Sequence, residues 1–175
     1  MDKQMKYTYL DSPVGRLLLV GSERGLAGVH FVNGKSVKKP ENGWLFDEKF
    51  FASAVAQLTA YFNRWLTEFD LPLDLQGTPF QIDVWRALQA IPYGETISYG
   101  ELARRIGRPK AVRAVGAANG QNPISIIIPC HRVIGGNGKL TGYGGGLENK
   151  EFLLSLERPE KQPAAQASLF QAAFQ

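Results

Sequence analysis

The spacing of apolar residues changes along this chain of 175 residues from a strand pattern to a helical pattern. Short apolar segments at residues 6–10, 16–20 and 26–32 are separated by the turn-forming runs Ser12-Pro13-Val14-Gly15 and Glu23-Arg24-Gly25. From residue 50, apolar residues instead recur at intervals of three and four, the period of an amphipathic helix. Strands first and helices afterwards predict an α+β fold, with a helix covering a small antiparallel sheet.

The first helix is expected between residues 50 and 69, and a domain boundary follows it. Its apolar positions are Phe51, Val55, Leu58, Phe62, Trp65 and Phe69. Residues 70–77 hold two carboxylates, a proline and a glycine without a sustained period, which is typical of a linker. We therefore predict an N-terminal α/β domain at residues 1–76, a second domain at residues 77–158 and a tail at residues 159–175.

Signals for helix starts are dense in the second domain. Thr78 can cap a helix whose capping box is completed by Gln81, and we expect this helix to end near residue 91. Ser98 and Glu101 form a second such pair, ahead of a short helix that ends at a glycine. A further helix, rich in Ala and Gly, is expected at residues 110–119. Two short helices joined by a tight turn predict a helix-turn-helix.

Five basic side chains, with no acidic one among them, lie on this helical hairpin: Arg104, Arg105, Arg108, Lys110 and Arg113. Nucleic-acid phosphates are the natural counterpart of such a cluster, and the net charge of +4 agrees with a polyanionic partner. A solvated basic face on an ordinary hairpin is the alternative. Small residues such as Ala114 allow close approach to a groove, but they equally allow tight helix packing.

A single cysteine, Cys130, follows a branched apolar run at residues 124–128, which we expect to be a buried strand. One Cys excludes an intramolecular disulfide, and one Cys with two His residues cannot supply a structural zinc site. A buried cysteine is usually inert, and it becomes a nucleophile only where a base or a cation favours the thiolate. His131 and Arg132 are the candidates. Neighbours on a strand point to opposite faces, so the chain must turn after Pro129 for His131 to act on the thiol.

A glycine-dense segment at residues 135–146 follows the cysteine. Because Lys139 is followed by Leu140 rather than by Ser or Thr, the segment is not a phosphate-binding P-loop. Glycine lets the backbone approach a ligand closely, and a flexible surface loop is the alternative. A closing helix is expected at residues 148–157, with Phe152 on its buried side.

The run Pro129-Cys130-His131-Arg132-Val133, the preceding Asn122-Pro123, Gly142-Tyr143 and a Lys-Glu-Phe-Leu-Leu helix closely resemble the O6-alkylguanine-DNA alkyltransferase family. Similar spacing covers residues 78–157. The resemblance implies a ribonuclease H-like N-terminal α/β domain and a mostly helical, winged-helix-like C-terminal domain that holds the helix-turn-helix. It also implies irreversible transfer of an alkyl group, without a cofactor or metal, from the O6 atom of guanine in double-stranded DNA to Cys130.

By position, His131 resembles the family's water-linked base, Glu157 the carboxylate that orients it, and Asn122 the residue that holds the active-site turn. Tyr99 resembles the tyrosine that helps to rotate the target nucleotide, and Arg113 the arginine inserted into the vacated base stack. Extrusion is needed because an O6 group inside a duplex is out of reach. We expect further DNA contacts from Ala114, Arg104 and Lys110, and a substrate pocket formed by Val133, Tyr143, Gly144 and Gly145.

Two other functions fit parts of this pattern. A helix-turn-helix protein can bind alkylated DNA without repairing it, as alkyltransferase-like proteins do, but those proteins lack the cysteine. A cysteine hydrolase using Cys130 and His131 would regenerate its thiol after each turnover, and the Arg-rich hairpin disfavours this function.

The tail carries a short motif at residues 166–170, which looks like the pentapeptide with which bacterial DNA-processing proteins bind the replication sliding clamp. The matching positions are Gln166, Ser168, Leu169 and Phe170. Apolar residues of the tail also recur at helical spacing, so the alternative is packing against the body of the protein. The N-terminus lacks the apolar stretch of a secretory signal or membrane span, and we expect a monomeric cytoplasmic protein without a membrane partner.

Overall fold

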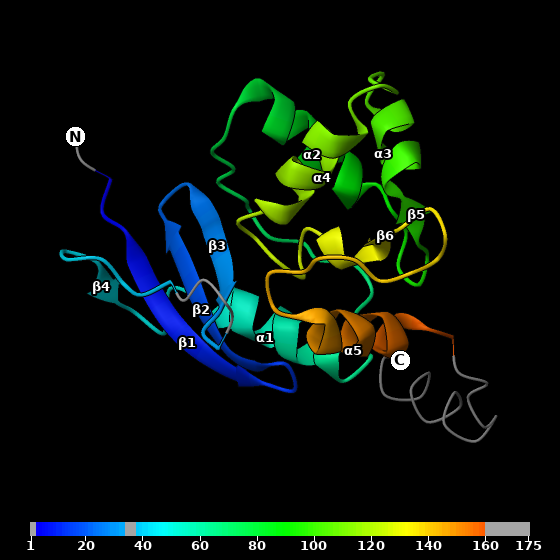
Figure 1. Ribbon diagram of the computed structural model, residues 1–175. Helices are drawn as coiled ribbons and strands as arrows, with labels where there is room; N and C mark the ends of the chain where they lie inside the picture. Colours follow the sequence, from blue (N-terminus) through cyan, green and yellow to red (C-terminus); the bar gives the residue numbers. More distant parts are fainter. Residues whose placement is uncertain (1–2, 34–37, 160–175) are drawn as a thin grey trace.

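The computed structural model describes residues 3–33 and 38–159, and it has a sheet on one side and a group of short helices on the other (Figure 1). We call residues 3–33 and 38–76 the sheet part, and residues 77–158 the helical part. The predicted α+β architecture is confirmed. None of the helices that the structure describes is long and apolar enough to cross a membrane.

The sheet is an antiparallel meander of β1 (Lys6–Ser12), β2 (Gly15–Ser22) and β3 (Gly25–Phe31), as the sequence predicts. A short strand, β4 (Leu45–Phe46), pairs parallel with β1, so that the strand order is β3-β2-β1-β4. Gly15 at φ +93° and Gly25 at φ +132° allow the two hairpin turns.

The helix after the sheet, α1 (Ala52–Phe62), is shorter than the period of apolar residues predicts. Arg64 adopts a left-handed conformation at φ +61°, and the N–H of Trp65 donates back to the Ala60 carbonyl at 2.8 Å. This is a Schellman ending, which stops the helix although the apolar spacing continues. The prediction of a helix to residue 69 is therefore wrong, and Trp65 is 64% exposed rather than part of the buried stripe.

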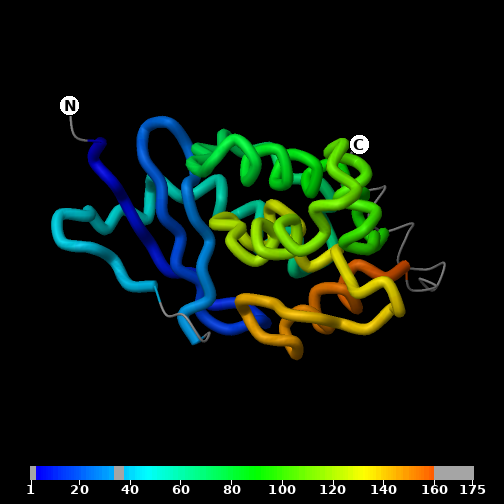
Figure 2. The backbone as a smooth tube through the Cα atoms, turned by 45° about the horizontal axis from the view of Figure 1, so that its top comes forward, coloured from blue at the N-terminus to red at the C-terminus, as the bar shows by residue number. Residues whose placement is uncertain are grey.

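The helical part contains α2 (Pro79–Gln89), α3 (Tyr99–Arg105), α4 (Val112–Gly120) and α5 (Leu147–Glu157). The capping box at Thr78 is complete, but at Ser98 only the hydroxyl contact to the Glu101 N–H forms. α3 and α4 pack as the predicted helix-turn-helix. Two parallel strands, β5 (Ile97–Ser98) and β6 (Val133–Ile134), lie beside them. Figures 1 and 2 show α5 (orange) along one side of this group.

Residues 124–128 do not form the expected strand, although their isoleucines are buried. Ile126 has φ +74°, a conformation that a branched residue rarely adopts, and the Ile128 N–H donates to the Ile124 carbonyl at 2.9 Å. The run is thus a compact loop. Apolar residues bury equally well in a loop whose polar groups are paired, so the composition alone misled the assignment.

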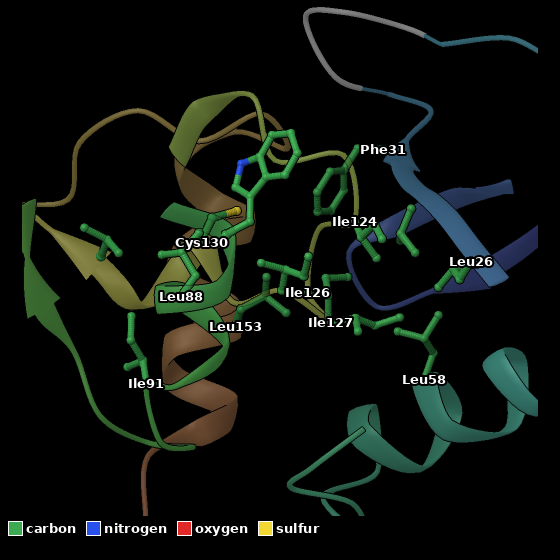
Figure 3. Close-up of a cluster of buried hydrophobic side chains, with 14 of the residues drawn as sticks. Leu26, Phe31, Leu58, Leu88, Ile91, Ile124, Ile126, Ile127, Cys130 and Leu153 are labelled. Carbon is green, nitrogen blue, oxygen red and sulfur yellow. The ribbon is translucent and has the colours of Figure 1, made fainter. Parts of the chain in front are cut away.

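One hydrophobic core joins the two parts (Figure 3). Leu26 and Leu58 enter it from the sheet part, the isoleucines of residues 124–128 occupy its middle, and Leu88 and Leu153 enter it from α2 and α5. Cys130 belongs to the same cluster. On α5, Phe152 is 37% exposed, so the prediction that it faces inward is wrong.

Candidate active site

The cysteine lies on a tight turn rather than on a strand. Cys130–Arg132 form a 3₁₀ turn directly after Pro129, which confirms that the chain turns at this point. Cys130 and His131 are both buried. Burial raises the pKa of the Cys130 thiol, although a hydrogen bond from Asn122 and the charge of Lys150 act in the opposite direction. The resting thiol is therefore protonated at neutral pH, and a base must take its proton before it can attack.

Asn122 holds the loop that leads to the cysteine. Its Nδ2 donates to the Ile128 carbonyl at 2.7 Å, and its Oδ1 accepts from the Ile124 N–H at 3.0 Å. Both bonds are buried, where an unpaired polar group costs about 1–3 kcal/mol. The side chain thus closes the loop at residues 124–128 and lies against the thiol of Cys130.

A buried carboxylate, Glu157 at the end of α5, binds the two residues that follow the cysteine. Its Oε1 lies 2.7 Å from Nε2 of His131 and accepts from a terminal nitrogen of Arg132 at 2.9 Å, while Oε2 accepts from Nε of Arg132 at 2.8 Å. Burial by itself would raise the pKa of Glu157, but the hydrogen bonds from His131 and Arg132 outweigh it and lower the pKa to about 2. Glu157 is therefore ionised at neutral pH, and Arg132 balances its charge.

The ionised carboxylate determines which nitrogen of His131 carries the hydrogen. Because it can only accept, Nε2 must be the N–H, and the neutral ring then has its lone pair on Nδ1. Nδ1 makes no hydrogen bond within the described residues. Burial lowers the pKa of His131, although Glu157 acts in the opposite direction, so the ring is neutral at pH 7. The site therefore contains an oriented base whose accepting atom has no hydrogen-bond partner among the described residues.

Two residues of this network were missed in the sequence. Tyr61 of α1 donates its hydroxyl to Oε1 of Glu157 at 2.7 Å. Lys150 of α5 donates to the carbonyls of Val133 and Thr141 at 2.7 and 2.8 Å, and so ties the segment after the cysteine to the glycine-dense loop. Lys150 precedes two buried leucines of α5 by three and four positions, and that spacing could have identified it. Nothing around Tyr61 in the sequence distinguishes it from an ordinary buried aromatic.

A cavity of about 320 Å³ opens onto Cys130, within the size range of small-molecule sites. Of the expected pocket residues, Tyr143 and Gly144 line it, whereas Val133 and Gly145 do not. The hydroxyl of Tyr143 is buried and has no hydrogen-bond partner in the part of the chain that the structure describes. Residues of the sheet part also form its wall, which the sequence did not indicate: His30, Phe31 and Lys38. No group of three or more His, Cys, Asp or Glu among the described residues could hold a metal ion.

The first turn of α4 presents Arg113 and Ala114 on the surface. Within the described residues, neither Arg113 nor Lys110 forms an ion pair. Arg104, however, is bound to Glu101 at 2.9 Å, as is the following arginine at 3.2 Å, so the basic run is partly neutralised by an acidic residue just upstream. Arg108, which lies over the ring of Phe80, also forms no ion pair within the described residues. Arg108, Lys110 and Arg113 are therefore the cations of this face that are left for phosphates.

Tyr99, at the start of α3, links the helix-turn-helix to the cavity side. Its ring lies against Gly116 of α4, where an added Cβ would be 3.7 Å away. Its hydroxyl accepts from Oγ1 of Thr141 in the glycine-dense loop at 3.3 Å. Tyr99 is therefore positioned between α4 and the loop that carries Tyr143.

Two protein-family models match this chain. The model described as "6-O-methylguanine DNA methyltransferase, ribonuclease-like domain" matches residues 5–75, and the one described as "6-O-methylguanine DNA methyltransferase, DNA binding domain" matches residues 79–159. The ribonuclease-like description agrees with the fold expected for the N-terminal domain.

Relatives from a bacterium and an archaeon are similar over nearly their whole length. The methylated-DNA–protein-cysteine methyltransferase of Mycolicibacterium paratuberculosis is 56% identical over 154 residues, which cover 88% of this chain and 93% of that protein. The protein of the same name from Methanosarcina acetivorans is 56% identical over 153 residues, covering 87% and 98%. The crystal structure of Mycobacterium tuberculosis OGT in complex with DNA is 55% identical with a TM-score of 0.82, covering 87% of this chain and 92% of that one.

The buried carboxylate leads to a prediction about stability in acid. The pKa of Glu157 is lowered from 4.5 to about 2 in the folded state. Its contribution to the free energy of unfolding is therefore fully present above pH 4.5 and is lost as the pH falls through 2. We expect protonation of this carboxylate to lower the free energy of unfolding by about 3 kcal/mol as the pH falls through that interval. His131, whose pKa is also lowered, acts in the same direction at a higher pH.

Urea unfolding at a series of pH values measures this effect. Glu157→Gln should be less stable than the wild type at neutral pH and should lose less stability on acidification. Glu151→Gln is the matched control, since Glu151 is exposed on the same helix. An acid dependence as steep in Glu157→Gln as in the wild type would contradict the prediction.

Proposed function

This chain belongs to the 6-O-methylguanine DNA methyltransferase family, and we propose that Cys130 is the residue that receives the alkyl group. The protein repairs DNA directly, by moving a methyl or other alkyl group from the O6 atom of guanine in the duplex to its own cysteine. The alkyl group remains on Cys130 as a thioether, whose S–C bond is stable in water, so each molecule reacts once.

The observation that carries the assignment of Cys130 is its position on the wall of the cavity, next to the buried pair of His131 and Glu157. Nδ1 of His131 takes the thiol proton through a water molecule, while Glu157 holds the ring by Nε2. The thiolate then attacks the alkyl carbon, the bond from this carbon to O6 breaks, and guanine leaves as an anion that acquires a proton. The hydroxyl of Tyr143, which has no hydrogen-bond partner among the described residues, can donate to the base inside the cavity.

The target nucleotide reaches the cavity by rotating out of the duplex, at a cost of a few kcal/mol. We place the first turn of α4 in the groove, so that Arg113 fills the gap in the base stack. Lys110 binds one phosphate, and Arg104 binds another in exchange for its exposed contact with Glu101. Ala114 allows the helix backbone to approach the DNA closely. Tyr99, between α4 and the glycine-dense loop, rotates the nucleotide and assists the departure of guanine. The exposure of Arg113 and the contacts of Tyr99 support these roles.

We divide the protein into an N-terminal domain at residues 1–76, a DNA-binding and alkyl-acceptor domain at residues 77–158 and a tail at residues 159–175. The family models, which match residues 5–75 and 79–159, support a boundary near residue 77. A monomeric protein located in the cytoplasm stays a prediction.

The first test replaces the nucleophile. Cys130→Ser should retain affinity for DNA that contains O6-methylguanine but lose transfer, because a hydroxyl is a much poorer nucleophile than a thiolate. Mass spectrometry should find one added methyl group on Cys130 of the wild type and none on the variant. Methylation of the variant at the wild-type rate would refute the assignment, and repeated release of a free product would indicate a hydrolase instead.

The second test separates extrusion from chemistry. Arg113→Ala should slow repair of duplex DNA roughly tenfold, which corresponds to about 1.4 kcal/mol of the extrusion cost. Its reaction with the free base O6-benzylguanine should be unchanged, because a free base needs no extrusion. Arg16→Ala, which removes the same charge from β2, is the control and should repair both substrates normally. Equal losses of Arg113→Ala on duplex and free base would rule out the stack-filling role.

The tail motif, Gln166, Ser168, Leu169 and Phe170, lies outside the described residues, and we propose that it binds a replication sliding clamp. Leu169 and Phe170 would enter an apolar pocket of the clamp, as short motifs of this kind do. Binding of the purified protein to a purified clamp should be lost when both are changed to Ala, while Phe174→Ala outside the motif should bind normally. No binding by the wild type, or binding by the double variant, ends the proposal.

A further inference from the structure

Tyr61 of the sheet part contacts the buried pair of His131 and Glu157. Tyr61, in the last turn of α1, is 0% exposed, and its hydroxyl donates to Oε1 of Glu157 at 2.7 Å. Residues 61 and 157 belong to the regions matched by two different family models. The bond therefore links the ribonuclease-like region directly to the carboxylate that holds His131.

The same carboxylate oxygen has several donors competing for it. Oε1 of Glu157 is bound to Tyr61, to Nε2 of His131 and to a terminal nitrogen of Arg132, at 2.7, 2.7 and 2.9 Å. A carboxylate oxygen offers about two lone-pair directions, so three short bonds share its electron density. A change in one donor must alter the strength of the others.

We propose that Tyr61 is a positioning residue for alkyl transfer, which acts through Glu157 on His131. The inference rests on the function proposed for Cys130. The hydroxyl fixes the rotation of the carboxylate, so that Oε1 faces Nε2 of His131. It also draws electron density from Oε1, which weakens the pull of Glu157 on the imidazole and favours the neutral ring.

The packing around Tyr61 indicates that the hydroxyl, rather than the ring, has this role. The ring makes edge or tilted contacts with Phe62, Phe69 and Tyr93, with centroids 5.4, 5.4 and 6.2 Å away. A phenylalanine would keep all three contacts. Burying a hydroxyl is unfavourable unless it is paired, and the partner of this one is an ionised carboxylate of the active site.

The loss of the hydroxyl should act through the pKa of His131. Without Tyr61, Glu157 holds its charge closer to Nε2 and the pKa of His131 rises, so a larger fraction of the ring is protonated at a given pH and cannot accept the thiol proton. The titratable and charged groups that face this pair are Cys130, Arg132, Lys150, Tyr93 and Tyr143. None of them changes in the variants of Tyr61, so a shift can be assigned to the hydroxyl.

Single-turnover rates of methyl transfer from an O6-methylguanine duplex, measured from pH ~5 to pH ~9, test the role. For Tyr61→Phe we expect the rising limb of the rate profile to move to higher pH by roughly half a unit to one unit. The rate on that limb then falls about three- to tenfold. If the hydroxyl only stabilises the fold, its removal should lower the melting temperature of the protein and leave the rising limb of the rate profile in place.

Tyr93→Phe is the matched control. Its hydroxyl donates to the Leu156 carbonyl at 3.4 Å, next to Glu157 in the chain, and makes no hydrogen bond with the carboxylate. This variant should have the pH profile of the wild type. Site-specific replacement of Tyr61 by 3-fluorotyrosine, whose hydroxyl is a stronger hydrogen-bond donor, should move the rising limb to lower pH. This replacement keeps both the ring and the hydroxyl in the core.

The outcomes are distinguishable. A wild-type protein that transfers no methyl group overturns the proposed function and, with it, the role of Tyr61. A wild type that methylates Cys130, together with unchanged profiles for both Tyr61→Phe and the fluorinated protein, overturns the role of Tyr61 alone. Opposite shifts of the two variants are the expected result.

Discussion

A single buried carboxylate organises the site and connects it to the rest of the molecule. Glu157 accepts hydrogen bonds from the side chains of Tyr61, His131 and Arg132, and so joins α1, the cysteine turn and α5. Removing one partner of a buried charge pair costs about 3–5 kcal/mol, because the remaining charge is left without compensation. The orientation of His131 and the integrity of the fold therefore depend on the same contacts.

The sheet part is bonded directly to the loop that precedes the cysteine. Strand β3 lies at the edge of the sheet, and the N–H of Val29 donates to the Pro123 carbonyl at 2.9 Å, while the N–H of Ser125 donates back to Val29 at 3.3 Å. The loop before the cysteine thus covers the exposed edge, where unpaired polar groups would otherwise remain. Together with the shared core in Figure 3, these bonds hold the turn of Cys130 rigidly.

The polar groups around the thiol differ in how fully they are paired. The buried side chains of Glu157 and Arg132 are paired with each other, and the amide of Asn122, which also lines the cavity, closes the backbone before the cysteine. On the cavity side, the hydroxyl of Tyr143 has no partner among the described residues, and the glycine-dense loop forms part of the wall. A rigid network that holds the nucleophile, together with reactive groups that make no hydrogen bond within the described residues, namely Nδ1 of His131 and the Tyr143 hydroxyl, is what a preorganised site requires.

The sequence by itself determined the order of the three long strands and of the helices, and the chemistry available. Local rules of spacing and capping predict the meander, the capping box at Thr78, the helix-turn-helix and the turn at Cys130 and His131. These rules need no knowledge of distant residues. The family also followed, since its motifs are local.

Only the tertiary structure decided where α1 ends, how residues 124–128 fold and which groups surround Glu157. A left-handed residue that stops a helix, and an isoleucine held at positive φ, are imposed by packing that apolar spacing does not encode. Tyr61 lies 96 residues from Glu157, and nothing local marks its hydroxyl as part of the site. Such contacts exist only after the chain has folded, because a buried charge selects its partners by proximity in space rather than in sequence.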